Sequence, residues 1–181
     1  MKPGTLYAVS GEAGWIYYGQ VGANKRLAFF RRRDRSVADV KEILASPVMF
    51  VLFVAAPSIT RALRSGQWRK IGHFPAGDDV MTPRNIVQWP SGETTVTVWD
   101  HDQTLYDTKV HDPYIQELEI MAVWDAEYHV PQRLTADFGQ EPGEWHVGGP
   151  IWRERKIKEE IARRFPDAPG HRLPRDWVPV G

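Results

Sequence analysis

The chain has 181 residues, which suits one domain or one domain with an extension. Its 23 basic and 23 acidic residues give a formal net charge of zero, so bulk charge favours neither a nucleic acid nor a membrane surface as partner. Cysteine is absent, which excludes disulfides, thiol catalysis and cysteine-ligated metal sites. The N-terminal segment also lacks the apolar core of a signal peptide, and these features together predict a cytoplasmic protein.

The opening of the chain predicts three short β-strands. Residues 5–9, 15–21 and 27–30 are rich in β-branched and aromatic side chains, and glycine-containing turns separate them. This part of the sequence holds no nucleophile motif, metal-ligand cluster or phosphate-binding loop. A chain that begins with such a sheet is predicted to bind a partner rather than to convert a substrate.

Two short helices and an apolar strand are predicted next, after the charged run RRRDRS, which we expect to be a loop. Ser36 is the expected N-cap of the first helix, with Asp39 in the capping-box position. The apolar residues 47–56 are too few to span a bilayer and predict a strand buried on both faces. Ser58 is the expected N-cap of the second helix, and Gly66 is its expected C-terminal stop.

The middle of the chain predicts a β-hairpin between polar segments. Residues 68–74 are expected to be a strand or a loop, and residues 75–83 a loop. The alternating residues 94–99 are predicted to pair with residues 86–89 across a Pro-Ser-Gly turn. Residues 100–112 are polar and predict a further loop.

The last third of the chain predicts one strand and two helices. Residues 117–124 fit both periods, but their Ile, Val and Trp content favours a strand. A short helix is expected over residues 131–138. A longer one is predicted over residues 150–165, beginning at Pro150 and carrying three acid-first ion pairs spaced i,i+4. Residues 167–181 are proline-rich and are expected to be extended.

Two His-Asp dipeptides, His101-Asp102 and His111-Asp112, suggest a metal site or an oriented general base. Adjacent residues on a strand point to opposite faces, however, and no complete ligand set accompanies these pairs. A solvated polar loop is the simpler interpretation, and a metal-dependent hydrolase is the alternative. We predict no metal and no cofactor.

A basic segment offers a second alternative, a nucleic-acid-binding module. Aromatic residues precede it, as they do in surfaces on which single-stranded bases stack. With zero net charge, a charged loop is the simpler interpretation. The residues of this alternative site are Lys25, Arg26, Arg31, Arg32, Arg33 and Arg35.

Acidic residues cluster in two of the predicted loops, where function tends to be located. Such loops would present an acidic face to a basic partner, and we predict the partner-binding site there. The predicted contact residues are Asp78, Asp79, Asp100, Asp102 and Asp107.

Several segments taken together resemble the immunity protein 26 family of bacterial polymorphic-toxin systems. The resemblance covers about residues 3–138 and consists of spaced apolar and glycine positions. The similar segments are PGTLYAV, GWIYYGQV, LAFF, MFVLFVA, WRKIG at Trp68–Gly72 and LEIMAVWDAEYHVPQRL at Leu118–Leu134.

The resemblance implies a sheet-centred α+β domain that binds and blocks a toxin encoded by the neighbouring gene, with no catalytic residues. We therefore expect a mainly antiparallel, strongly bent, barrel-like sheet with short flanking helices and a C-terminal helix. Residues 3–138 are expected to form this domain, and residues 139–181 a C-terminal extension. The neutral charge leaves the type of toxin open.

Overall fold

The computed structural model describes residues 1–90, 93–100, 103–110, 112–115 and 118–138. These residues divide into two compact units, which are described separately below. Residues 1–83 and 122–138 form the first unit, and residues between 84 and 121 form the second. The predicted helix at residues 150–165 and the predicted extended tail lie outside the described residues.

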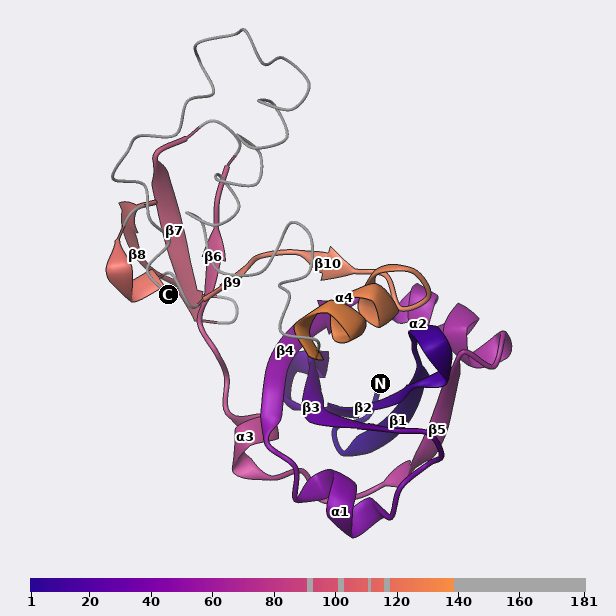
Figure 1. Ribbon diagram of the computed structural model, residues 1–181. Helices are drawn as coiled ribbons and strands as arrows, with labels where there is room; N and C mark the ends of the chain where they lie inside the picture. The colour runs from indigo at the N-terminus through magenta and orange to yellow at the C-terminus, as the bar shows by residue number, and fades with distance from the viewer. Residues whose placement is uncertain (91–92, 101–102, 111, 116–117, 139–181) are drawn as a thin grey trace, which may run out of the picture. The chain divides into compact units, whose positions relative to one another are not determined.

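A six-stranded sheet forms the frame of the first unit, in the order β10-β4-β3-β2-β1-β5. Its strands are β1 (Thr5–Ser10), β2 (Ile16–Val21), β3 (Leu27–Asp34), β4 (Val48–Val54), β5 (Trp68–His73) and β10 (Val123–Trp124). Neighbouring strands pair antiparallel, apart from β10, which pairs parallel with β4. The sheet curls into a half-barrel (Figure 1), which confirms the predicted α+β fold with its strongly bent, mainly antiparallel sheet.

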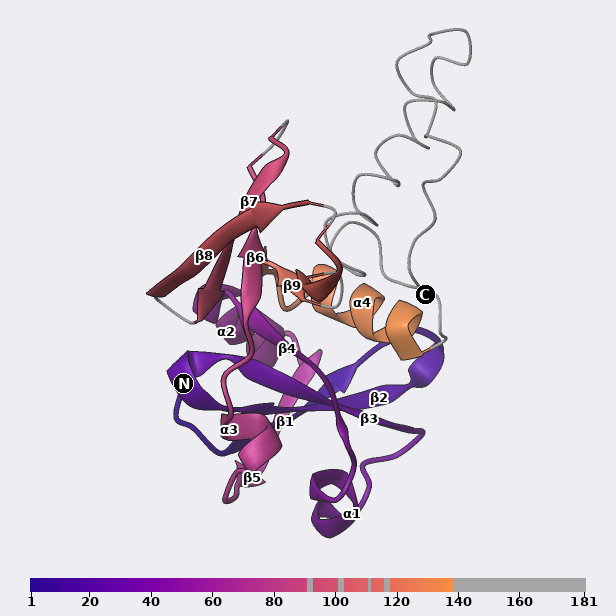
Figure 2. The same cartoon turned by 90° about the vertical axis from the view of Figure 1, so that its left-hand side faces the viewer.

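Short helices cover both faces of the central strands. They are α1 (Val40–Leu44), α2 (Ala56–Arg64), α3 (Asp78–Met81) and α4 (His129–Phe138). Figure 2 shows α4 on one side of β1, β2 and β3, with α1 and α3 on the other. Side chains alternate between the faces along each strand, so Tyr7 and Val9 join the core under α4 and α2, while Leu6 and Ala8 join the core under α1 and α3. This double coverage explains why the strands read as continuous apolar runs.

The second unit is a four-stranded sheet in the order β8-β7-β6-β9. Its strands are β6 (Ile86–Gln88), β7 (Thr95–Asp100), β8 (Gln103–Lys109) and β9 (Glu119–Ile120). The antiparallel pairing of β6 with β7 confirms the predicted hairpin. The prediction of a loop over residues 100–112 was wrong, because β8 is an edge strand whose side chains are almost all exposed. Such a strand is held by its backbone pairing with β7 and shows no apolar pattern.

Two helix starts differ from the prediction. α1 is capped by Asp39, whose carboxylate accepts a hydrogen bond from the backbone N–H of Lys41, and Ser36 lies before the helix. α2 begins after Ala55, and Ser58 lies in its first turn, where its hydroxyl donates to the Ala55 carbonyl. The Ser58 side chain instead connects α2 to a distant part of the chain, because its oxygen accepts a hydrogen bond from the backbone N–H of Ala126. The predicted stop is confirmed at Gly66, which has a φ of +78° just after α2.

Four further expectations need correction. The charged run after residue 30 is not a loop, because β3 continues to Asp34, which pairs with Ile16. β4 is a strand as predicted but is not buried on both faces, since Phe53 is 47% exposed. Residues 75–83 contain the single turn of α3. The single strand predicted over residues 117–124 is two short strands, β9 and β10, in different sheets.

The predicted helix over residues 131–138 is confirmed, and it begins two residues earlier, at His129. None of the helices in the described part of the chain combines the length and the apolar character needed to cross a lipid bilayer.

Candidate functional site

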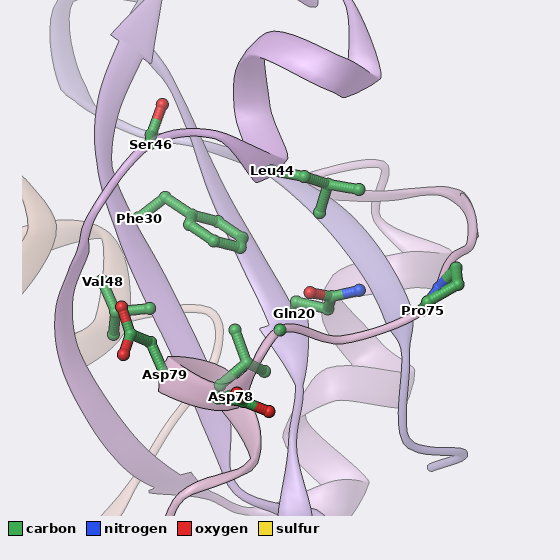
Figure 3. Close-up of a pocket in the computed structure, with 10 residues that line it drawn as sticks. Gln20, Phe30, Leu44, Ser46, Val48, Pro75, Asp78 and Asp79 are labelled. Atoms are coloured by element: carbon green, nitrogen blue, oxygen red, sulfur yellow. The ribbon is translucent and has the colours of Figure 1, made fainter.

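A pocket of about 260 Å³ lies in the first unit, on the face of the sheet that α1 and α3 cover. Its walls come from β2, β3, the C-terminal end of α1, the start of β4 and the segment around α3 (Figure 3). Apolar side chains form half of the lining, and two carboxylates belong to it. We call it the acidic pocket and define it by Gln20, Phe30, Leu44, Val48, Asp78 and Asp79.

Gln20 supplies a buried polar group to the acidic pocket. The side chain is 0% exposed, and its Nε2 donates to the carbonyls of Phe74 at 3.1 Å and Gly4 at 3.3 Å. Those two bonds fix the amide orientation, because a flipped amide would place its oxygen against two carbonyl oxygens. Oε1 then has no hydrogen-bond partner among the described residues. Figure 3 shows this oxygen directed toward the space between Phe30 and α3.

An unpartnered acceptor of this kind has a free-energy cost that a bound donor can remove. Leaving a buried polar group without a partner costs about 1–3 kcal/mol, whereas satisfied groups are the rule in folded proteins. Among the buried side-chain nitrogen and oxygen atoms of the described residues, Gln20 Oε1 is the one that lacks a hydrogen-bond partner. The acidic pocket therefore presents a site for a hydrogen-bond donor.

The two carboxylates of the acidic pocket come from the first turn of α3. Asp78 and Asp79 are both exposed, and neither side chain has a hydrogen bond or ion pair with another described residue. The lining of the pocket contains no lysine, arginine or histidine to neutralise them. A donor that carries positive charge therefore suits this pocket better than a neutral one.

The position of α3 depends on a close backbone contact with the turn between β2 and β3. A Cβ atom added at Gly22 would lie 2.1 Å from the Val80 carbonyl oxygen, a distance that atoms cannot adopt without a shift. Glycine at this position therefore lets α3 pack directly against the sheet. The same helix carries both aspartates, so Gly22 helps to place the acidic wall of the pocket.

We expect Gly22→Ala to lower the free energy of unfolding by about 1–3 kcal/mol, as overpacking does. The matched control is Gly77→Ala, because a Cβ at Gly77 meets nothing within 4 Å and φ there is −69°. That substitution should change stability much less than Gly22→Ala does, because the added Cβ meets no neighbouring atom. Denaturant unfolding of both variants checks the prediction. Equal stabilities of the two variants would contradict the proposed role of Gly22.

The structure does not bring the five predicted contact aspartates together within one unit. Asp78 and Asp79 belong to the first unit, and Asp100 and Asp107 to the second. Asp107 accepts a hydrogen bond from the Thr97 hydroxyl at 2.7 Å across the β7–β8 pair. Asp102 lies outside the described residues. Of the predicted set, Asp78 and Asp79 line the acidic pocket.

The alternative metal site cannot be assembled from the described residues, since His101, Asp102 and His111 lie outside them. Asp112 is described, and its carboxylate accepts hydrogen bonds from the Thr108 hydroxyl and the Tyr114 backbone. Those contacts shape the turn after β8. Within the described ranges, no group of three or more histidine, aspartate or glutamate side chains is placed to hold a metal ion.

The basic segment is largely paired within the protein. Arg33 lies over the rings of Trp15 and Phe138, at 4.3 and 4.5 Å from their centroids, and Arg35 lies over Trp15 at 3.7 Å. Arg35 also donates to the carbonyl of Ala13. These contacts hold the end of β3 against neighbouring aromatic rings.

Arg32 bridges two carboxylates. It contacts Asp34 at 2.8 Å and Glu42 at 2.7 Å, and the hydrogen bond to Asp34 is the largest cause that raises the pKa of Arg32. Lys25, in the β2–β3 turn, and Arg31, on β3, are exposed, while Arg26 has a partner within the chain. Four of the six basic residues, Arg26, Arg32, Arg33 and Arg35, therefore have partners within the protein.

Sequence reasoning identified the α3 aspartates but missed Gln20 and Phe30. The signal for Gln20 was present, because it stands two positions after Tyr18 in an apolar strand and must share its buried face. A polar residue at an inward position is more informative than an exposed apolar one.

Searches for similar proteins returned no match among protein-family models, curated proteins or solved structures.

Proposed function

We propose that this protein is a cytoplasmic, non-enzymatic immunity protein, which binds a cognate bacterial toxin and neutralises it. The observation that carries the proposal is the acidic pocket, in which two carboxylates without ionic partners among the described residues lie beside a buried acceptor without a hydrogen bond. Such a pocket is built to receive a positively charged donor. The toxin would supply that donor from a basic part of its surface.

The resemblance to immunity protein 26 supports the same assignment. Five of its segments coincide with β1, β2, β3, β4 and β5, which are strands of a single sheet. The acidic pocket lies on that sheet, so these five segments and the candidate site belong to one unit. A protein bound there would block the toxin's active site or an exosite by steric and electrostatic occlusion.

Interfaces of this kind combine long-range steering with a few buried anchors. The exposed carboxylates of Asp78 and Asp79 would attract a basic surface and raise the association rate, an effect that salt screens. The apolar walls around Phe30 and Leu44 would surround the inserted side chain and exclude water. Loss of the carboxylates should therefore affect binding more strongly than loss of exposed charges elsewhere.

An affinity pull-down after co-expression tests the proposal. The tagged protein is expressed with the C-terminal domain of the toxin encoded by the neighbouring gene, and we expect a stable complex. The charge-reversal variant Asp78→Lys/Asp79→Lys should recover less toxin domain at the same expression level. A folded protein that retains no toxin domain would contradict the proposed function.

A further inference from the structure

The geometry points to an arginine side chain of the partner as the group that enters the acidic pocket. This inference rests on the proposed function, because the arginine would belong to the toxin. It concerns the chemistry of one site, however, and can be tested on this protein alone.

Size limits what the pocket can hold. Sites for drug-sized ligands have volumes of about 300–1,000 Å³, and this pocket has about 260 Å³. It therefore fits a single side chain better than a whole metabolite. A long side chain is needed to reach Gln20, since this residue is fully buried while the two aspartates are exposed.

The parts of an arginine side chain match the chemical groups that line the pocket. Its planar guanidinium has five N–H donors, so it can donate to Gln20 Oε1 and still pair with a carboxylate. Its alkyl stem can pack against Leu44 and Val48. The ring of Phe30 also lines the pocket, and aromatic rings attract guanidinium groups more often than ammonium groups.

Figure 3 places these groups around one space. Phe30 and Leu44 lie on one side, the α3 aspartates on the other, and the Gln20 amide closes the end next to Pro75. The unpartnered oxygen of Gln20 is an observation independent of the acidic residues, and it also calls for a donor. Both observations are met by one cationic group that carries several N–H bonds.

The test is a titration of the isolated full-length protein with ethylguanidinium chloride, which mimics the end of an arginine side chain. The readout is the side-chain amide signal of Gln20 in nitrogen–proton correlation NMR spectra. We expect a saturable shift of this signal, because Oε1 gains a hydrogen bond. Ethylammonium and the neutral analogue ethylurea should each bind more weakly than ethylguanidinium.

The decisive variant is Asp78→Asn/Asp79→Asn, which removes two charges and keeps the shape of the side chains. We expect about fivefold weaker binding of ethylguanidinium, as for the loss of two solvent-exposed charge contacts. The matched control is Glu12→Gln/Glu93→Gln. Both glutamates are exposed, lie outside the pocket lining and have no side-chain partner among the described residues. This control should bind ethylguanidinium as the unchanged protein does.

The possible outcomes distinguish failure of the arginine inference from failure of the proposed function. Absence of a saturable Gln20 shift, or equal affinities of the two double variants, would overturn the arginine inference while leaving a toxin complex intact. A saturable shift that depends on the aspartates supports the inference even where the neighbouring toxin domain fails to bind, a failure that would overturn the proposed function alone.

Discussion

Replacing Arg133 with methionine is expected to lower the free energy of unfolding by about 3–5 kcal/mol, the usual cost of removing one partner from a buried ion pair. Arg133, on α4, is 3% exposed and contacts the Asp137 carboxylate at 2.7 Å. Its guanidinium also lies over the rings of Phe50 and Trp124, at 4.4 and 4.9 Å from their centroids. Methionine fills similar space but leaves the nearly buried Asp137 without this cation.

A double-mutant cycle separates the ion pair from general packing. Arg133→Met, Asp137→Ala and the combined variant are unfolded in denaturant, and the combined loss should be clearly smaller than the sum of the single losses. Replacing both members of a buried pair is often nearly neutral, because no uncompensated charge then remains. Additive losses, or a change below about 1 kcal/mol for Arg133→Met, would show that the pair does not hold α4 in the half-barrel.

Trp68→Ala is expected to cost about 3–5 kcal/mol, as for other large aromatic truncations in a core. Trp68 is 1% exposed on the edge strand β5, and its ring contacts those of Tyr7 and Phe29. Its indole N–H donates to the Ala126 carbonyl at 3.0 Å. The side chain thus joins the sheet to the segment that leads into α4, two parts of the chain that are distant in sequence.

Trp68→Phe isolates the hydrogen bond, because it keeps an aromatic ring and removes the N–H donor. We expect it to lose about 1–3 kcal/mol, since the buried Ala126 carbonyl loses this donor. Denaturant unfolding followed by far-ultraviolet circular dichroism gives both values. If Trp68→Ala were no less stable than Trp68→Phe, ring packing at this position would contribute little, contrary to the contacts described.

The sequence predicted best the elements that carry their own local signals. β1 and β2 are marked by dense β-branched and aromatic residues, and the end of α2 by the glycine at position 66. The strand β8 could not be predicted in this way, because an edge strand with exposed side chains has the composition of a loop. Its identity depends on backbone pairing with β7, which only the folded structure shows.

Competition between neighbouring polar residues explains the misplaced helix starts. Ser36 and Asp39 are both good caps, and the choice depends on where the chain after β3 can turn into a helix. The backbone of Ser36 accepts a hydrogen bond from the Tyr18 hydroxyl, and that hydroxyl accepts one from the Ala38 N–H, so these residues stay against the sheet. α1 therefore begins only after Asp39.

The sequence predicted the acidic residues of the candidate site but not the pocket beside them. Acidic residues between strands indicated Asp78 and Asp79, whereas the pocket beside them depends on the packing of α3 against the turn at Gly22. That contact joins residues more than fifty positions apart in the chain, and no local pattern reports it. The missing partner of Gln20 Oε1 is likewise a property of the packed state.

Growth rescue tests the central claim most directly. Cells that express the toxin domain of the neighbouring gene are given the unchanged protein, Asp78→Lys/Asp79→Lys or the control Glu12→Lys/Glu93→Lys, at matched levels of folded protein. We predict growth with the unchanged protein and with the control, and loss of growth with the α3 variant. Equal rescue by all three would contradict neutralisation through the acidic pocket, and absence of rescue by the unchanged protein would contradict the immunity function itself.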